Sequence, residues 1–250
     1  MSQFIYDAWT HPATLEAVSN AAGIDLIPVM DWEIAHTNIQ VGGKGLAGVR
    51  ELGEVPSPAL SVEEVASIRD ATGANADRLV DDWHVDSYQF VCVVMLSDAS
   101  TMIGGETAIE TGNGEVVKVR AAQVGGGVVL QGGCTKHAAF RTIGANERVT
   151  MVTSFRPKSL SIKDRSTLRN IGFETSDMNE VHYQFATYRL KLVQERISKY
   201  LRDLKERKAS LSVGDELISR EGFGGVVENQ VDYLRETVYE MFDRIKDQNK

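Results

Sequence analysis

The stretch from 79 to 158 constrains the fold more than any other part of the chain. Short runs rich in β-branched and apolar residues, such as EVVKVR, GGVVLQG and RVTMVTSF, alternate there with glycine, asparagine and aspartate. Several short strands with turn residues between them are typical of an antiparallel sandwich or barrel. We therefore expect a β core in this region.

Other patterns surround this core. Residues 10 to 22 place helix formers after a Thr and a Pro, which predicts a short helix ended by Gly23. Residues 24 to 41 predict one or two further strands, and 42 to 58 read as a loop, either a disordered one or one that closes over a site. The segment 61 to 72 has capping-box spacing and predicts another helix.

Beyond Pro157 the pattern becomes helical, with apolar residues three and four apart among charges in two long segments. We expect one α+β domain over 1–250, with the β core at about 24–158 and a helical region at about 160–250. The first long segment carries an apolar stripe that would suit a homodimer formed through these helices. The stripe consists of Phe185, Tyr188, Leu192, Tyr200 and Leu204.

The composition restricts the cellular location and the classes of binding partner that we expect. A content of 42% hydrophobic and 25% charged residues is typical of a globular protein. There is no apolar run of about 18 residues for a membrane helix and no signal-peptide pattern at the start, so we expect a cytoplasmic protein without a membrane partner. A net charge of -8 repels phosphate backbones and argues against nucleic acid. Two cysteines, expected to be reduced, are too few for a disulfide framework.

The segment WHVDSYQFVCVVML opens with two ionisable groups in an otherwise apolar run. Side chains alternate along a strand, so His84, Asp86, Tyr88 and Phe90 are predicted to share one face. A buried imidazole and carboxylate need a charge partner or a metal, and the alternative is a surface ion pair. Tyr88 and Phe90 would then either line a substrate pocket or fill the barrel.

A second group of polar residues follows the glycine-rich strand. His137 precedes a GAN turn, and Arg148 and Thr150 begin the next strand. If the two strands form a hairpin, His137 and Arg148 lie at matching heights. Two histidines and one carboxylate can occupy one face of an octahedral metal, as in non-haem iron oxygenases. An arginine with a hydroxyl suits the far carboxylate of a chelating dicarboxylate.

Each of these residues also has an ordinary interpretation. His137 could be a core histidine, Arg148 an exposed residue at a hairpin start, and Thr150 a simple strand former. Arg156 has the same parity as Arg148 and is a candidate contact for a substrate carboxylate, or else a solvated strand end.

The series H84-V-D86, H137 and R148-V-T150 resembles the Fe(II)/2-oxoglutarate-dependent dioxygenases. The likeness covers about 79–158 and includes G104-G105-E106-T107, similar to a Gly-Gly turn in that family. The chain also resembles fungal members of secondary metabolism. The resemblance implies a double-stranded β-helix, or jelly roll, flanked by N- and C-terminal helices. It also implies Fe(II) bound by the two histidines and the aspartate, with 2-oxoglutarate held by Arg148 and Thr150.

The same resemblance implies a reaction with O2 that converts 2-oxoglutarate to succinate and CO2. It would oxidise a C–H bond of a small metabolite such as an amino acid, by hydroxylation, desaturation or a ring closure such as aziridine formation. Halogenation is disfavoured because related halogenases lack the carboxylate that Asp86 supplies.

Two other functions use the same ligands. One is a non-catalytic metal-binding jelly-roll module, and the other is a metal-dependent hydrolase or isomerase. A module that only binds metal has no need for the cation and hydroxyl of Arg148 and Thr150. A hydrolase or isomerase would work without oxygen or 2-oxoglutarate.

Overall fold

The computed structural model describes residues 2–41, 79–98, 103–119, 123–140, 142–143 and 147–244. The chain divides into two compact units. The first comprises Met1–Val29, Glu33–Lys158 and Asp164–Ser166, and the second comprises Met30–Trp32, Ser159–Lys163 and Thr167–Lys250. The predicted loop at 42–58 and helix at 61–72 lie outside the described residues.

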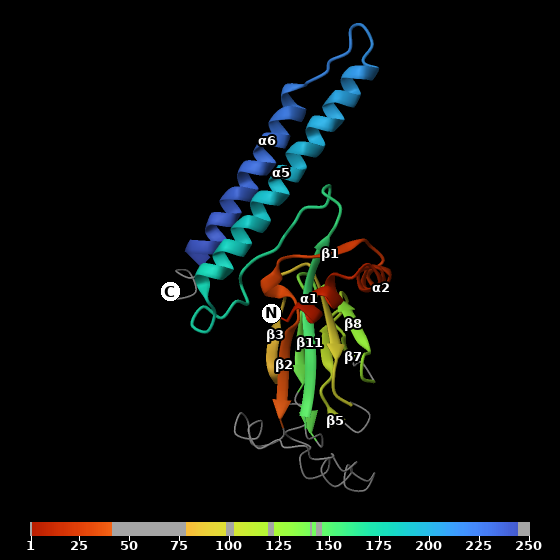
Figure 1. The fold of residues 1–250 in the computed structure, drawn as a ribbon, viewed down its shortest axis with the longest axis vertical. Coiled ribbons are helices and arrows are strands. Elements are labelled where there is room, and N and C mark those ends of the chain that lie inside the picture. Colours follow the sequence, from red (N-terminus) through yellow and green to blue (C-terminus); the bar gives the residue numbers. More distant parts are fainter. Residues whose placement is uncertain are drawn as a thin grey trace. The chain divides into compact units, whose positions relative to one another are not determined.

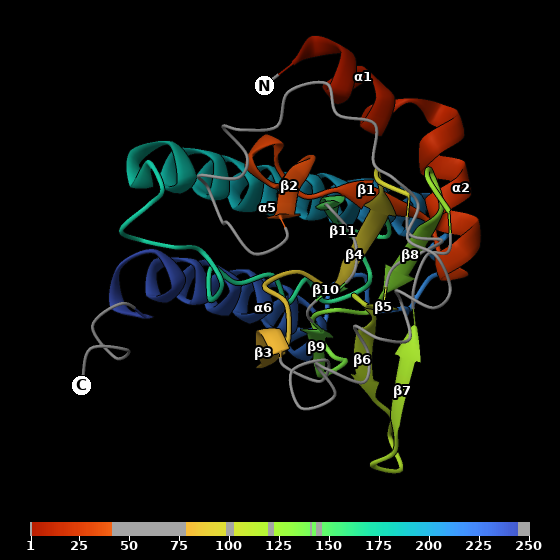
Figure 2. The same ribbon diagram turned by 90° about the horizontal axis from the view of Figure 1, so that it is seen from below.

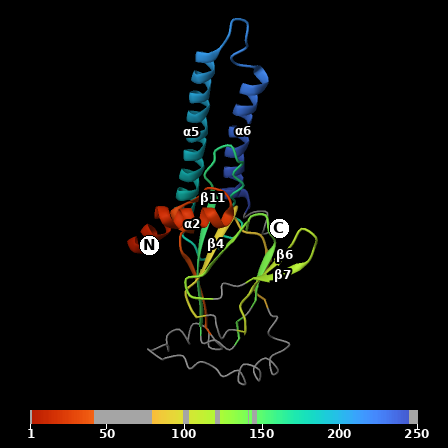
Figure 3. The same ribbon diagram turned by 90° about the vertical axis from the view of Figure 1, so that its right-hand side faces the viewer.

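Among the described residues, the first unit contains two main antiparallel sheets and a third sheet of only two short strands. In the larger one, strands follow the order β1-β11-β4-β8, and β2 pairs with the same strand β11. Its strands are β1 (Leu26–Pro28), β2 (His36–Val41), β4 (Phe90–Met95), β8 (Gly127–Leu130) and β11 (Glu147–Pro157). The smaller one has the order β3-β9-β6-β7, formed by β3 (Leu79–His84), β9 (His137–Phe140), β6 (Thr107–Glu110) and β7 (Val116–Val119). The sheets are separate layers in Figures 2 and 3.

The long strand β11 organises the larger sheet, as Figure 1 shows. It pairs with β4 along one edge, and with β2 and then β1 along the other. Its side chains alternate between two environments. Phe155 lies in a core cluster with Trp9, Val18, Leu26, Ile34 and Cys92, on the face toward the N-terminal helices. Arg148 and Thr150 lie on the opposite face, toward the smaller sheet.

Two short helices, α1 (Gln3–Thr10) and α2 (Pro12–Ala22), precede the first strand. The Nδ1 atom of His11 accepts a hydrogen bond from the Ala13 amide and caps α2. Gly23 ends this helix in a left-handed conformation with a φ of 70°, which glycine adopts without steric cost. The predicted helix end at Gly23 is therefore confirmed.

Two sequence-based expectations about strands are wrong. Asp86 does not continue a strand from His84, because β3 ends at His84 and β4, in the other sheet, begins at Phe90. The strands that carry His137 and Arg148 do not form a hairpin either. Their chain crosses from the smaller to the larger sheet, through β10 (Thr142–Ile143), which pairs with β5 (Ile103–Gly104). Side-chain alternation could not reveal these changes of sheet.

The second unit is built on two long helices that run antiparallel in Figure 3. They are α5 (Met178–Ser210) and α6 (Arg220–Val238), and α6 continues into a π-helical turn, η2 (Tyr239–Asp243). Asp177 and Ser219 cap the two N-termini by accepting backbone hydrogen bonds. Of the stripe proposed for dimerisation, Phe185, Tyr188 and Leu192 are buried. No helix in the described part of the chain has the length and apolar character needed to cross a membrane.

The class is therefore mixed, with helices and antiparallel sheets as expected. The strands predicted at 24–41 and 79–158 and the two C-terminal helices are present. The chain divides into two compact units. The expectation that it behaves as one domain stays a prediction.

Candidate metal centre

His84, Asp86 and His137 converge on one point. His84 ends β3 and His137 begins β9, and the two are direct partners across the strand pair, with ring centroids 4.4 Å apart. Asp86 follows β3 in a loop, where its amide donates a 2.8 Å hydrogen bond to the carbonyl of Gly132. One ligand atom from each of the three side chains lies within 4.8 Å of the others. Such a cluster can hold a metal ion.

The second nitrogen of each ring orients the histidines. Nδ1 of His84 lies 2.6 Å from the carbonyl oxygen of Asp82, and Nδ1 of His137 lies 2.8 Å from that of Thr135. A carbonyl only accepts, so each Nδ1 carries the proton, and Nε2 of the neutral ring keeps its lone pair. Each Nε2 lies 3.5 Å from an oxygen of Asp86. Backbone partners of this kind are typical of metal-binding histidines.

The electrostatics at Asp86 also favour a cation. Burial raises the pKa of Asp86, but the interactions of its carboxylate with His137 and His84 outweigh burial and bring the pKa to about 2. The pKa of His137 is raised, because its interactions with Asp86 outweigh burial. The site therefore favours a positive charge beside Asp86, which a divalent ion could supply.

Gly132 makes room for the aspartate, a role that the sequence analysis missed. A Cβ atom at Gly132 would lie 1.8 Å from Oδ2 of Asp86. Any side chain there would displace the carboxylate. The glycine-rich run before His137 was visible in the sequence, but only the tertiary contact relates Gly132 to Asp86.

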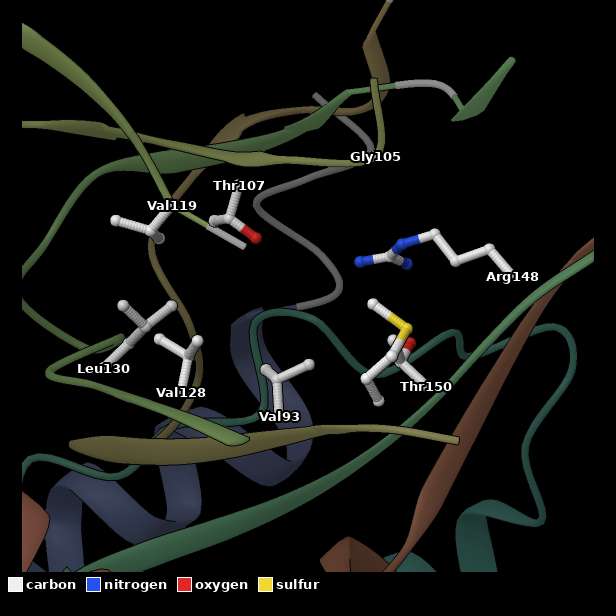
Figure 4. A pocket seen from close by; sticks show the side chains of 9 residues that line it. Val93, Gly105, Thr107, Val119, Val128, Leu130, Arg148 and Thr150 are labelled. Carbon is white, nitrogen blue, oxygen red and sulfur yellow. The ribbon is translucent and has the colours of Figure 1, made fainter. Parts of the chain in front are cut away.

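A small cavity between the two sheets holds Arg148 and Thr150 (Figure 4). Arg148 extends from β11 toward Thr107 of β6, and apolar side chains form the other walls. These apolar residues are Val93, Met95, Val119, Val128 and Leu130. The lining thus combines one cation and two hydroxyls with a largely apolar surface.

The Arg148 guanidinium is buried, and few interactions offset the loss of its contact with water. The residue is 7% exposed, and its Nε has no hydrogen-bond partner within the described part of the chain. Burial lowers the pKa of Arg148, and the charge of Glu106 partly opposes this effect. Gly105, with a φ of 73°, lies against the Arg148 side chain. A Cβ at this position would lie 3.4 Å from Cδ and Nε of Arg148. The geometry leaves the guanidinium suited to an anionic ligand.

The remaining predicted site residues lie in different surroundings. Tyr88 is 2% exposed and interacts with the carboxylate of Glu33. Phe90 packs against the core cluster that contains Phe155, on the face of the larger sheet toward the N-terminal helices, rather than in the cavity between the sheets. Arg156 is buried rather than solvated, and its Nη1 donates a 2.9 Å hydrogen bond to the carbonyl of Pro157.

Glu33 is a second residue that the sequence analysis missed. It ends the short 3-10 turn η1 (Asp31–Glu33), and its Oε2 accepts a 2.9 Å hydrogen bond from the Ser154 hydroxyl. Burial raises the pKa of Glu33 to about 7, and the negative charge of Asp86 contributes to the increase. The carboxylate is therefore near enough to the triad to interact with it. Nothing in the local pattern around Glu33 indicated this.

Several solved structures are similar to this chain at low sequence identity. No family model matches the chain, and no curated protein does. Among solved structures, a prolyl-4-hydroxylase from Pseudomonas putida is 16% identical with a TM-score of 0.26, over 64% of this chain and 91% of that one. A 2OG-Fe(II) oxygenase family oxidoreductase from Burkholderia pseudomallei is 18% identical with the same TM-score, over 57% and 77%.

A bsmA homolog from Methylobium petroleophilum is 22% identical with a TM-score of 0.26, over 30% of this chain and 33% of that one. The match thus spans about a third of that protein. At these identities and TM-scores the likenesses do not establish a shared fold or activity. The functional proposal therefore rests on the residues of this chain.

Proposed function

We propose that the chain is an Fe(II)/2-oxoglutarate-dependent oxygenase that oxidises a C–H bond of a small metabolite and releases succinate and CO2. The observation that carries this proposal is the convergence of His84, Asp86 and His137, with both Nδ1 atoms held by backbone carbonyls. Two neutral imidazoles and one carboxylate form the set that suits non-haem Fe(II) and leaves coordination positions open.

The donor atoms fit a divalent metal ion. Oδ2 of Asp86 is buried without a hydrogen-bond partner among the described residues, and it faces Nε2 of His137 at 3.5 Å. The three side chains would hold the ion through one ligand atom each. Gly132 keeps the space beside the carboxylate open.

The chemical character of the cavity lining suits one end of a dicarboxylate. The buried guanidinium of Arg148 can donate a forked pair of hydrogen bonds to a carboxylate. Thr150, 2% exposed, lies beside it with a hydroxyl. The apolar walls would exclude water and suit the methylene groups of 2-oxoglutarate. These features favour the oxygenase over a module that only binds metal, because such a module has no need for the buried cation.

The roles of the chain's own residues follow from these contacts. His84, Asp86 and His137 would hold the iron, and Arg148 with Thr150 would orient the co-substrate. When bound, iron with 2-oxoglutarate and O2 supplies the oxidising chemistry. The carbonyls of Asp82 and Thr135 fix the Nδ1–H tautomer of each neutral ring, so that its Nε2 lone pair is aimed at the site. The apolar cavity limits the access of water to the co-substrate.

The jelly-roll architecture belongs to the same proposal. Along the chain, β2, β4, β8 and β11 of the larger sheet interleave with β3, β6, β7 and β9 of the smaller one. Such alternation between two facing antiparallel sheets is typical of a jelly roll. The substrate class that we propose is a small amino acid, and the outcome is hydroxylation, desaturation or a ring closure such as aziridine formation. The proposed setting is fungal secondary metabolism.

Anaerobic titration tests the function directly. Fe(II) is added to the metal-free protein, followed by 2-oxoglutarate, and the weak visible metal-to-ligand band is monitored. We expect the band in the wild type and no band in Asp86→Ala. Asp82→Asn is the matched control, since this nearby acid is exposed and only its backbone carbonyl contacts His84. Absence of the band in the folded wild type would overturn the proposal.

The co-substrate site has its own test. Arg148→Gln should retain metal but bind 2-oxoglutarate about 100-fold more weakly, or about 3 kcal/mol, because a charged hydrogen-bond donor is lost. Arg235→Gln is the control, since Arg235 is an exposed residue paired with Asp232 on α6. Equal 2-oxoglutarate affinity in the wild type and Arg148→Gln would remove the assigned role of Arg148.

A further inference from the structure

Glu33 places a second carboxylate beside the proposed metal centre. Its partner Ser154 is 4% exposed and belongs to β11. Side chains alternate along a strand, so Ser154 lies on the same face as Arg148 and Thr150, toward the smaller sheet. The Tyr88 hydroxyl also interacts with Glu33, and Tyr88 lies two residues after Asp86. The acid is thus tied to both the loop of the triad and the inner face of β11.

No cation in the described part of the chain compensates this carboxylate. The interactions of Glu33 are with the hydroxyls of Ser154 and Tyr88, both uncharged, and with the negative charge of Asp86. An ionised carboxylate that is partly buried without a counter-charge is costly, and the repulsion from Asp86 adds to this cost. The increase in the pKa of Glu33 expresses the same penalty.

A purely structural role does not require an acid at this position. The turn after η1 is also held by the Ala35 amide, which donates to the Thr153 hydroxyl at 2.9 Å. A glutamine at position 33 could accept the Ser154 hydrogen bond without the cost of burying a charge. An acid beside a candidate active centre is useful when a cation arrives with the ligand.

We propose that Glu33, together with Ser154, binds the protonated amino group of the substrate, and that the enzyme therefore acts on small primary amines such as amino acids. This inference rests on the proposed oxygenase function and specifies its substrate class. The ammonium ion would supply the counter-charge that the partly buried carboxylate lacks. Its three N–H donors would pair with the carboxylate and the serine oxygen.

Binding to a redox-inactive form tests this assignment without turnover. Zn(II)-loaded protein with 2-oxoglutarate is titrated with alanine, valine, leucine and isoleucine, each beside the deamino acid with the same carbon skeleton. Ligand-observed NMR by saturation transfer reports binding. We expect at least one amino acid to bind at least tenfold more tightly than its deamino partner, and Glu33→Gln to abolish that preference.

Two variants control this experiment. Asp31→Asn, an exposed acid at the start of the same turn, should bind as the wild type does. Glu33→Asp keeps the charge and should retain part of the preference. Thermal unfolding establishes that each variant is folded.

Three results would overturn the inference while leaving the oxygenase function intact, provided that the anaerobic Fe(II)/2-oxoglutarate band is present. The first is binding of no amino acid in the series by the wild type. The second is equal binding of the amino and deamino acids. The third is an undiminished preference in Glu33→Gln. Absence of the band itself would instead overturn the proposed function.

Discussion

Gly132 and Asp86 are in such close contact that the aspartate occupies the space where a side chain at Gly132 would lie. The distance from a Cβ at this position to Oδ2 would be 1.8 Å, and the carbonyl of Gly132 accepts the Asp86 amide hydrogen bond at 2.8 Å. The segment before β9 therefore both fixes the backbone of the triad loop and leaves room for its carboxylate.

Gly132→Ala should displace the carboxylate and weaken metal binding about 10- to 100-fold, the range seen when partners of metal ligands are altered. Isothermal titration calorimetry with Mn(II) measures the effect. Gly127→Ala is the matched control, because a Cβ at Gly127 would make ordinary contacts of 3.6 Å and longer. Equal Mn(II) affinity in Gly132→Ala and the wild type would contradict the assigned role of Gly132.

Gly105→Ala should impair 2-oxoglutarate binding. Its Cβ would lie 2.7 Å from Oγ1 of Thr142 and 3.4 Å from Cδ and Nε of Arg148, so the arginine would have to move. Gly114→Ala is the control: this glycine also has a positive φ, but a Cβ there meets no atom within 4 Å. Both variants should lose roughly 1 kcal/mol of stability from backbone strain. Only Gly105→Ala should lower the co-substrate affinity, measured by titration of the visible band.

Metal affinity should rise with pH. The pKa of His137 is raised by Asp86, so its protonated form stabilises the metal-free fold below the unfolded pKa near 6.5, and this contribution disappears as the pH rises through the folded value. Metal must displace that proton, so Mn(II) affinity should increase from about pH 6 to 8. Calorimetry in buffers of different ionisation enthalpy measures the release. A binding enthalpy independent of the buffer at pH 6.5 would refute proton displacement.

Glu33→Gln should stabilise the protein at alkaline pH. Burial raises the pKa of Glu33 from 4.5 to about 7, so the folded state holds the proton more tightly than the unfolded state. Stability conferred by the protonated acid is present below about pH 4.5 and is lost as the pH rises to 7. The variant should therefore gain about 3 kcal/mol relative to wild type between pH 4 and 8. Urea unfolding at both pH values measures it, and a difference independent of pH would argue against a buried acid.

The helical unit offers an apolar face for a homodimer, which we retain as a prediction. Three of the residues expected to form the interface are buried within the chain. Other apolar side chains of α5, which recur at spacings of seven and four residues, are exposed. They are Tyr183, Leu190, Ile197 and Leu201. If a second copy covers this face, Ile197→Lys should give a monomer by light scattering, and Glu206→Lys, on the opposite side of the helix, should not. A monomeric wild type would contradict the prediction.

Much of the candidate site could be predicted from residue types and spacing. The pair His84 and Asp86, the later His137, and Arg148 with Thr150 are recognisable because metal ligands and an anion-binding cation are uncommon in apolar strands. The geometry proposed for them was less accurate. Asp86 reaches the histidines from a loop, and His137 and Arg148 come from different sheets.

The sequence by itself determined the local elements and the identity of the candidate ligands. Alternation, capping residues and glycine ends act over a few residues, so they indicate strands, helices and chain turns directly. Only the tertiary structure decided which strands share a sheet, that Gly132 leaves space for the Asp86 carboxylate, and that Glu33 accepts a hydrogen bond from Ser154 of β11. These contacts join residues that are far apart in the chain. They depend on packing of the whole fold, which no local pattern encodes.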